Sequence, residues 1–226
     1  MNLTKTSLSL IRKFLLTNHN LYNSAGPHVI PFLNKKRKFS QFKMENKNNI
    51  VWIDMEMTGL DIEKDRILEI SALVTNQDLE IISPTFHTII HQPDNIMANM
   101  NEWCLKNHAE TGLIDDVKKS NVNIKEAESK LLDFLKPFTE EKANPLAGNT
   151  IWMDRIFLRK YMYNVDIYLN YRIIDVSSIK ELCKRWAPHI AENVPKKRNK
   201  HRAVEDIEDS IKELQYYREN LFQLPL

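Results

Sequence analysis

The segment Ile50–Asp61, with the sequence IVWIDMEMTGLD, decides the fold of this chain and the place of its chemistry. Its first residues are apolar and β-branched, as in a short buried strand, and Thr58-Gly-Leu-Asp61 supplies the turn that follows. Asp54 and Glu56 are two residues apart in the strand, so their side chains point to one face, about 7 Å apart along the chain. Two such carboxylates can share a hard cation such as Mg²⁺, which prefers oxygen ligands.

The carboxylate pair alone is a weak signal. The chain has 30 Asp and Glu among 226 residues, so about four such pairs arise by chance. The position of this pair makes it more informative. Val51, Trp52 and Ile53 indicate a central strand, where carboxylates are costly unless they have a partner.

Strand and helix patterns continue from this segment along the chain. Further strand-like segments are Arg66–Thr75, Ile81–His91, a short apolar piece around Leu146, and Arg172–Val176. Helical patterns cover residues 122–135, Asp154–Tyr163, Ser177–Trp186 and Ala203–Leu221. Strands that come first, followed by strands that alternate with helices, predict an α/β fold with a mixed β-sheet flanked by helices.

The net charge of +2 divides into two parts of opposite sign. Residues 1–44 hold eight basic and no acidic side chains, so the other residues hold 24 basic against 30 acidic ones, a formal charge of −6. We therefore predict a basic N-terminal extension, residues 1–45, which is disordered or helical, and one globular domain, residues 46–226. Four glycines and nine prolines exclude a collagen-like or low-complexity chain.

The N-terminal extension has the pattern of a targeting segment. Within residues 3–15 the apolar side chains can share one helical face away from the basic ones, and no acidic residue is present. This pattern predicts a mitochondrial transit peptide. The basic run Lys35–Lys38 would alternatively serve as a nuclear address or a nucleic-acid contact. A second start at Met44 would give a cytosolic or nuclear form.

Cysteine content and hydropathy exclude two other classes of protein. Cys104 and Cys183 are too few for a disulfide framework or a four-ligand zinc site, so we expect two core thiols in a reducing compartment. Apolar runs fall well short of the roughly 18 residues that span a bilayer. We therefore expect no membrane insertion.

Three further residues complete a candidate site. Asp154 opens an apolar helical stretch, and taken alone it suits a helix N-terminus, where the dipole favours an acid. His201 and Asp206 are five residues apart, which separates them by about 140° on one helix. If the helix begins near Arg202, His201 lies on the preceding loop and can bend toward Asp206. A solvated histidine in a basic loop is the alternative.

Four carboxylates, Asp54, Glu56, Asp154 and Asp206, carry the charge of −4 that neutralises two divalent cations. Two such ions form a clamp for in-line attack on a phosphodiester. A neutral histidine is a suitable base for the attacking water. The combination therefore predicts a two-metal nuclease.

The order Asp-x-Glu, then Asp, then His and Asp five residues apart resembles the DEDDh exonucleases, which have a ribonuclease H-like fold. More narrowly, the chain is similar to the oligoribonucleases over residues 48–221. The segments that carry this likeness are Ile50–Asp61, Gly148-Asn149 with Asp154, Tyr171-Arg172 with Asp175-Val-Ser177, and His201–Asp206. The Met-Glu-Met-Thr-Gly form is characteristic of oligoribonucleases.

The resemblance implies a metal-dependent exoribonuclease. It implies that His201 is the general base, and that two Mg²⁺ or Mn²⁺ ions are bound by Asp54, Glu56, Asp154 and Asp206. It further implies 3′-to-5′ hydrolysis of very short RNA, chiefly dinucleotides, to nucleoside 5′-monophosphates.

The resemblance also implies how the substrate is held. Leu60 and Trp103 match residues that wedge or stack the bases, although without the resemblance Trp103 would be assigned to the core and Leu60 to a turn. Tyr171 matches a residue contributed across a homodimer. The group that caps the 5′ phosphate, and so limits substrate length, corresponds to His108, Thr150, Arg172 and Ser177. Thr150 replaces a more usual serine, and Trp152-Met153 replace small and amidic residues, which leaves 5′-end handling open.

The charge of residues 45–226 bears on the substrate. A protein that tracks long RNA typically has a basic stripe, because neutralisation of the phosphates supplies most non-specific affinity. A formal charge of −6 therefore favours a short RNA substrate and no long nucleic acid. The alternatives are a DEDDh exonuclease acting on longer RNA or DNA 3′ ends, and a catalytically silent RNA-binding protein, which the presence of all five catalytic-type residues disfavours.

Overall fold

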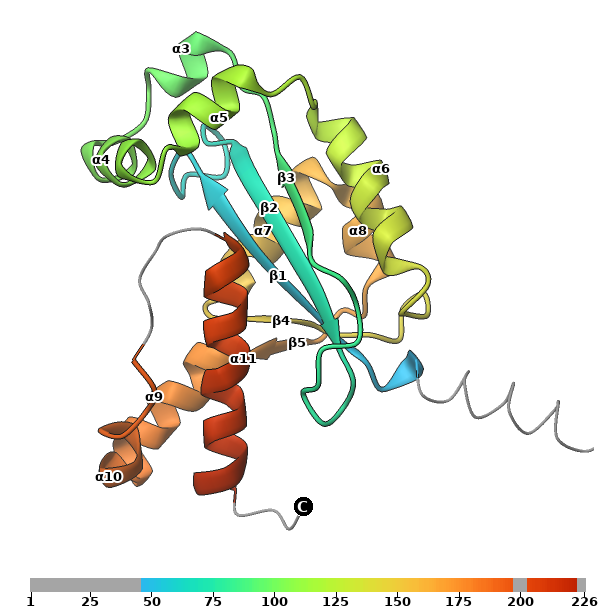
Figure 1. Ribbon diagram of the computed structural model, residues 1–226, viewed down its shortest axis with the longest axis vertical. Coiled ribbons are helices and arrows are strands. Elements are labelled where there is room, and N and C mark those ends of the chain that lie inside the picture. The colour runs from blue at the N-terminus through green and yellow to red at the C-terminus, as the bar shows by residue number, and fades with distance from the viewer. Residues whose placement is uncertain (1–45, 197–202, 223–226) are drawn as a thin grey trace, which may run out of the picture. The chain divides into compact units, whose positions relative to one another are not determined.

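The computed structural model describes residues 46–196 and 203–222, so the predicted extension, residues 1–45, lies outside the described residues. The strands are β1 (Ile50–Met57), β2 (Ile67–Thr75), β3 (Phe86–Ile89), β4 (Leu146–Gly148) and β5 (Ile173–Asp175). The helices are α3 (Asp94–Met97), α4 (Glu102–Glu110), α5 (Leu113–Lys119), α6 (Ile124–Leu135), α7 (Trp152–Tyr161), α8 (Tyr163–Tyr168), α9 (Val176–Trp186), α10 (Pro188–Ala191) and α11 (Ala203–Asn220) (Figure 1).

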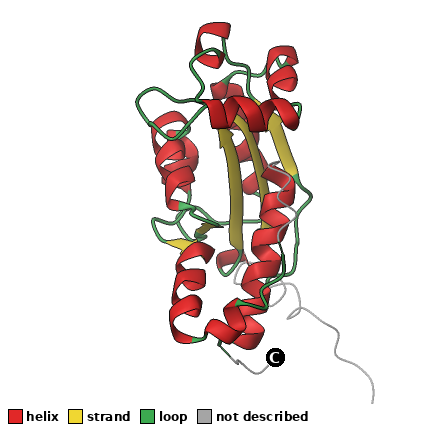
Figure 2. Ribbon diagram, turned by 90° about the vertical axis from the view of Figure 1, so that its left-hand side faces the viewer, coloured by secondary structure: helices red, strands yellow, loops and turns green. Residues whose placement is uncertain are grey.

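Strand β1 lies in the middle of a five-stranded sheet with the order β3-β2-β1-β4-β5. It is antiparallel to β2 and parallel to β4, while β3 and β5 extend the sheet antiparallel to β2 and parallel to β4, respectively. Figure 2 shows helices on both sides of the strands. The predicted mixed sheet flanked by helices is therefore confirmed, with Ile50–Met57 as its central strand.

Some elements differ from the predicted ones. Strand β3 is shorter than the segment Ile81–His91, because Ile81 forms only an isolated bridge to Thr75 and Pro84 has no N–H to donate to a neighbouring strand. The sequence patterns do not predict α3, α4, α5, α8 or α10. Each has at most nine residues, too few turns to display an apolar period. The side chain of Asn101, which caps α4, is a local signal for one of them.

The two faces of β1 point into two different cores. Val51 and Ile53 belong to a core that α6, α7 and α8 complete, whereas Trp52 belongs to a core that α9 and α11 cover. Because side chains alternate along a strand, Asp54 and Glu56 continue the row of Trp52. The alternation therefore turns both carboxylates toward α11.

Strand β4 ends after three residues and leads the chain into α7. Its last residue is Gly148, where a Cβ would lie 2.9 Å from Ile151 Cδ1 and 3.1 Å from the carbonyl oxygen of Ile53, so a side chain there would crowd both neighbours. Thr150 then adopts a φ of 56°, a left-handed conformation that is uncommon for a β-branched residue. This turn brings the first turn of α7, with Asp154, to β1.

The predicted core thiols are confirmed. Cys104 and Cys183 are buried and unbridged, and burial raises the pKa of each thiol. Among the helices described, none combines the length and the apolar character that a membrane crossing requires.

Candidate active site

Three carboxylates converge where β1 faces α11. Asp54 and Glu56 of β1 and Asp206 of α11 each present a carboxylate oxygen, and these oxygens lie within 4.8 Å of one another. All three side chains are half-buried. Asp206 lies in the first turn of its helix, where the helix dipole favours a negative charge.

The chemistry of these three side chains fits a divalent cation. Like charges at this separation repel one another, and a cation among them would favour their ionised forms. Carboxylate oxygens are the ligands that Mg²⁺ and Mn²⁺ prefer. The cluster can therefore hold a metal ion, and within residues 46–196 and 203–222 it is the one group of this kind.

Asp154, the fourth predicted carboxylate, is not a member of this cluster and is only 7% exposed. Burial raises the pKa of its carboxyl to about 7, and the charge of Asp175 adds to this effect, while the backbone N–H groups of Asp154 and Met55 donate to it and oppose the shift. Met55 stands between Asp54 and Glu56 in the sequence. Asp154 therefore reaches the strand that carries the carboxylate pair.

The predicted general base, His201, lies outside the described residues, as does the basic segment that precedes it, residues 197–200. The helix that carries Asp206 begins at Ala203. The role of His201 therefore stays a prediction.

His108 of α4 lies beside Glu56. Its ring is buried, and Nε2 donates a hydrogen bond to the carbonyl oxygen of Met57 at 2.9 Å. Nδ1 then faces Glu56 Oε2 at 3.9 Å, which makes an ion pair when the ring is protonated. This side chain thus connects α4 to the end of β1 next to the carboxylate cluster.

A hollow of about 390 Å³, here called the β1–α4 hollow, opens beside the carboxylates. It is lined by Met55, Glu56, Met57, Gly59, Leu60, Asn101, Trp103 and Cys104. Leu60 and Trp103 are 65% and 59% exposed, so Trp103 is not a core residue. Asn101 accepts a hydrogen bond from the N–H of Cys104 at 2.8 Å, which fixes the first turn of α4 and the tryptophan on it. The structure therefore brings both predicted base-binding side chains to the same hollow as Glu56.

A second hollow of about 410 Å³, the β5–α9 hollow, is lined by Thr150, Trp152, Asp175, Ser177, Ser178, Glu181 and Leu182. The hydroxyl oxygens of Thr150 and Ser177 are 3.1 Å apart and share a hydrogen bond. Asp175 Oδ1 accepts the backbone N–H of Thr150 at 3.1 Å and that of Ser177 at 2.9 Å. Two of the predicted 5′-phosphate ligands are thus neighbours here.

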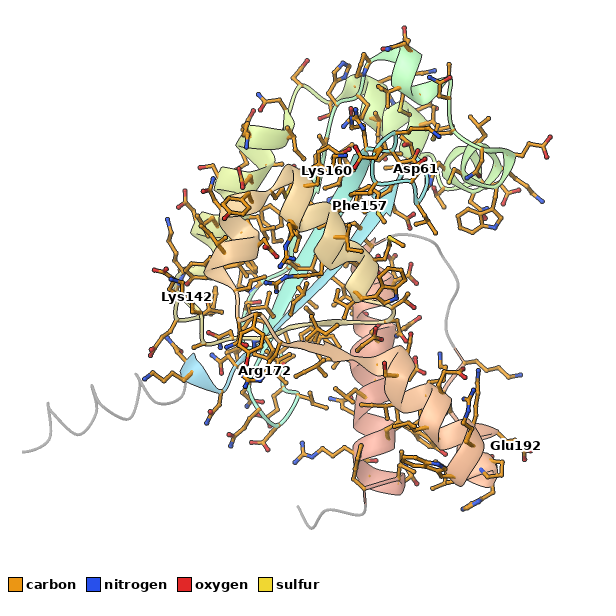
Figure 3. The ribbon with its side chains drawn as sticks, turned by 180° about the vertical axis from the view of Figure 1, so that it is seen from behind. Asp61, Lys142, Phe157, Lys160, Arg172 and Glu192 are labelled. Carbon is orange, nitrogen blue, oxygen red and sulfur yellow. The ribbon has the colours of Figure 1, made fainter. Side chains whose placement is uncertain are left out.

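Tyr171 and Arg172 precede β5 and line neither hollow. The guanidinium carbon of Arg172, labelled in Figure 3, lies 4.5 Å from the centre of the Tyr171 ring, which is a cation–π contact. Tyr171 is 73% exposed. Both side chains are therefore accessible to a ligand or to another chain.

Asn149 and Asp175 belong to the site although the sequence analysis gives them no role. Asn149 Oδ1 accepts from Ser177 Oγ at 3.0 Å, and its Nδ2 donates to Ser210 Oγ at 2.8 Å. Ser210 Oγ donates in turn to the carbonyl oxygen of Asp206 at 2.7 Å. The position of Asp175 just before a helix is a local sequence signal for an N-cap. The local sequence around Asn149 does not indicate its hydrogen bonds, because Ser177 and Ser210 lie far along the chain.

Residues 51–214 match the RNase T exonuclease family. A probable oligoribonuclease of Drosophila melanogaster is 51% identical over 175 residues, which are 77% of this chain and 83% of the fly protein. An oligoribonuclease of Francisella tularensis is 45% identical over 181 residues, which are 80% of this chain and the whole of the bacterial protein. The resemblance stated from the motifs is confirmed.

Solved structures support the fold. Exonuclease I of E. coli in complex with a dA16 oligonucleotide superposes with a TM-score of 0.61 at 15% identity, over 78% of this chain. The chain spans 42% of the length of that enzyme. At this identity the likeness concerns the fold alone, and it confirms an exonuclease-type α/β domain.

Proposed function

This chain belongs to the oligoribonuclease family of 3′-to-5′ exonucleases, and we propose that it hydrolyses very short RNA, chiefly dinucleotides, to nucleoside 5′-monophosphates. The observation that carries the proposal is that the carboxylate cluster lies next to the β1–α4 hollow. Asp54, Glu56 and Asp206 form a cluster suited to a cation, and Glu56 also lines the hollow that Leu60 and Trp103 border. A scissile phosphate at the cluster would leave the adjoining base within reach of both apolar side chains.

Two divalent cations, Mg²⁺ or Mn²⁺, would be held by Asp54, Glu56, Asp154 and Asp206. When bound, such ions polarise the phosphodiester and stabilise charge on the attacking and leaving oxygens. The four carboxylates supply the balancing charge of −4. The high pKa of the buried Asp154 carboxyl fits this assignment, because a neighbouring cation offsets the cost of ionising it.

The protein's own part in the reaction is to place a base and to hold the substrate. His201 takes the proton from a water molecule that attacks the phosphorus of the 3′-terminal nucleotide. The bond between phosphorus and the 3′ oxygen of the preceding nucleotide breaks, and the 3′-terminal nucleotide leaves as a nucleoside 5′-monophosphate. Repetition from the new 3′ end gives the 3′-to-5′ direction.

Substrate length would be set at the β5–α9 hollow and its surroundings. Thr150 and Ser177 offer two adjacent hydroxyls at the hollow, and Arg172 can grip phosphate oxygens with two parallel hydrogen bonds. His108, the fourth member of the proposed 5′-phosphate group, lies beside Glu56 and does not line this hollow. The formal charge of −6 on residues 45–226 agrees with a short substrate rather than long nucleic acid.

A homodimer is part of the proposal. Figure 3 views the side on which α7, α8, β5 and α9 lie. Large apolar side chains that are 38% to 73% exposed line these elements, namely Trp152, Ile156, Tyr163, Ile167, Tyr171, Ile173, Leu182 and Trp186. Apolar surface of this extent is typical of an interface. Sedimentation of the parent and of Tyr171→Ala tests the dimer, and the activity of the variant tests whether Tyr171 completes the site.

The proposal also covers the location of the protein. The bacterial relative aligns over its whole length with 80% of this chain, and the family match begins at residue 51, which suits an extension over residues 1–45 outside an exonuclease domain at 46–226. We assign this extension to mitochondrial import, with a possible untargeted form from Met44. Immunoblotting of cell fractions tests both, and one full-length, wholly cytosolic species would contradict them.

The decisive experiment is the turnover of a 5′-labelled diribonucleotide with Mg²⁺, with EDTA as the control. We expect release of nucleoside 5′-monophosphate that stops when EDTA is added. A 20-mer RNA and a 20-mer DNA provide the comparison. Equal rates on a 20-mer and on the dinucleotide would favour the alternative of an exonuclease for longer 3′ ends, and no turnover of any substrate would favour a silent RNA-binding protein.

A further inference from the structure

Leu60 is an apolar side chain that the protein holds in solvent. It is 65% exposed, so burial of the leucine contributes little to fixing its position. It lies in the segment Thr58–Arg66, here called the Leu60 loop, between β1 and β2. Polar contacts within this loop must therefore set where the leucine points.

One carboxylate ties the loop on both sides of Leu60. Asp65 Oδ1 accepts a hydrogen bond from Thr58 Oγ1 at 2.8 Å, and Asp65 Oδ2 accepts one from the backbone N–H of Asp61 at 2.8 Å. Gly59 packs directly against this carboxylate, so that a Cβ at position 59 would collide with it. The side chain of Asp65 thus closes the turn around Gly59 and Leu60.

Further hydrogen bonds hold this turn against the rest of the domain. Thr58 Oγ1 accepts the N–H of Arg66 at 3.0 Å, and the Tyr161 hydroxyl makes a hydrogen bond of 2.8 Å with the carbonyl oxygen of Asp65. The guanidinium of Arg66 donates to the Tyr161 hydroxyl at 2.7 Å. Tyr161 is the last residue of α7, and the labels Asp61 and Lys160 in Figure 3 mark the loop and this end of the helix.

We infer that Asp65 is a positioning residue for substrate binding, which fixes Leu60 at the mouth of the β1–α4 hollow before the substrate arrives. A loop ordered in advance loses less conformational entropy when the base binds. Each oxygen of the carboxylate accepts one hydrogen bond, whereas an amide in its place has one acceptor oxygen. To keep a bond to the amide nitrogen, the Thr58 hydroxyl would have to stop donating and accept from it as well as from the N–H of Arg66. The inference rests on the proposed function, because it requires Leu60 to contact a base.

A double-mutant cycle tests this inference. In the parent background, Asp65→Asn should raise KM for the diribonucleotide about 5-fold or more and change kcat less than about 2-fold, because ground-state and transition-state binding are lost equally. In the Leu60→Ala background, Asp65→Asn should change KM less than about 2-fold, because the side chain through which Asp65 acts is gone.

Matched variants separate positioning from charge and from folding. Asp61→Asn removes a negative charge from the same loop but leaves both hydrogen bonds of Asp65, and its KM should match that of the parent. Thr58→Val keeps Asp65 but removes the hydrogen bonds of the hydroxyl with Asp65 and with the N–H of Arg66, so it should raise KM, whereas Thr58→Ser keeps the hydroxyl and should not. This second pair replaces Asp65→Asn if that variant fails to fold.

Hydrogen exchange reports the loop directly, and the backbone amides of residues 58–66 should exchange faster in Asp65→Asn while those of β1 keep the rate of the parent. The inference would be overturned if Asp65→Asn changed KM by the same factor in the parent and in the Leu60→Ala background, or if it left KM unchanged in the parent background. A parent protein that does not turn over the dinucleotide would instead refute the proposed function, so the two failures are distinct.

Discussion

The two hollows have nearly the same volume, about 390 and 410 Å³, and differ in the side chains that they present to a ligand. The β1–α4 hollow is bordered by the exposed side chains of Leu60 and Trp103, which suit the flat apolar face of a base. The β5–α9 hollow has the hydroxyls of Thr150 and Ser177 next to each other, which suit a polar end group. A substrate that uses both hollows must therefore offer a base to one and a polar end group to the other.

Asp154 has a neighbour in each hollow. The backbone N–H that donates to its carboxyl belongs to Met55 of the β1–α4 hollow, and the charge that adds to its pKa shift belongs to Asp175 of the β5–α9 hollow. The comparison therefore predicts three kinds of variant: those that affect every substrate equally, those that affect base binding, and those that affect only the 5′ end.

The largest loss of activity is expected from Asp154→Asn, because Asp154 has a neighbour in each hollow and is a proposed metal ligand for every substrate. The amide has nearly the shape of the carboxyl but cannot supply the negative charge that a cation requires. We expect turnover to fall about 10²- to 10³-fold on every dinucleotide, with or without a 5′ phosphate. Initial rates with Mg²⁺ measure this, and a variant as fast as the parent would remove Asp154 from the catalytic role.

The same residue predicts a pH dependence of the metal-free protein. Burial raises the pKa of Asp154 from 3.8 to about 7, so the fold favours the neutral carboxyl. This contribution to stability is complete below about pH 4 and is lost as the pH rises toward 7, by at most about 4 kcal/mol. Urea unfolding in EDTA should therefore show the parent losing stability relative to Asp154→Asn over this range. Parallel pH profiles of the two proteins would contradict the burial argument.

Trp103→Ala should affect the β1–α4 hollow alone. Loss of a stacking surface costs about 1 to 3 kcal/mol per base, so KM should rise about 5- to 100-fold. The increase should be the same for 5′-phosphorylated and 5′-hydroxyl dinucleotides, because the indole contacts neither end group. Phe222→Ala, at an exposed aromatic residue that lines neither hollow and lies outside the proposed dimer interface, is the control.

Ser177→Ala should have the narrowest effect, because it is limited to substrates with a 5′ phosphate, and so the opposite selectivity to Trp103→Ala. A hydrogen bond from one hydroxyl to a charged phosphate oxygen contributes about 1.5 to 3 kcal/mol. The value of kcat/KM for a 5′-phosphorylated dinucleotide should therefore fall roughly 10- to 100-fold. For the 5′-hydroxyl dinucleotide it should change less than about 2-fold. If both substrates lose equally, the two hollows are not chemically separate and the comparison fails.

Sequence patterns predicted those helices and strands that are long enough to show a clear run or period of apolar residues. The short apolar, β-branched run with Val51, Trp52 and Ile53 identified the central strand, and the apolar stripe over residues 122–135 identified α6. The helices between Asp94 and Lys119 escaped prediction because they are short, and one of them carries Trp103. That tryptophan also shows the limit of composition, since a large aromatic residue is usually buried, whereas this one is 59% exposed.

The sequence by itself determined that Asp54 and Glu56 share one face of β1 and that Asp154 and Asp206 lie at helix starts, because both properties depend on local geometry. Only the tertiary structure decided that α11 covers that face and brings Asp206 within 4.8 Å of the other two oxygens. The burial of Asp154 and the hydrogen bonds that hold the Leu60 loop against Tyr161 of α7 also depend on packing. Such contacts form when distant parts of the chain meet, and neither spacing nor composition specifies them.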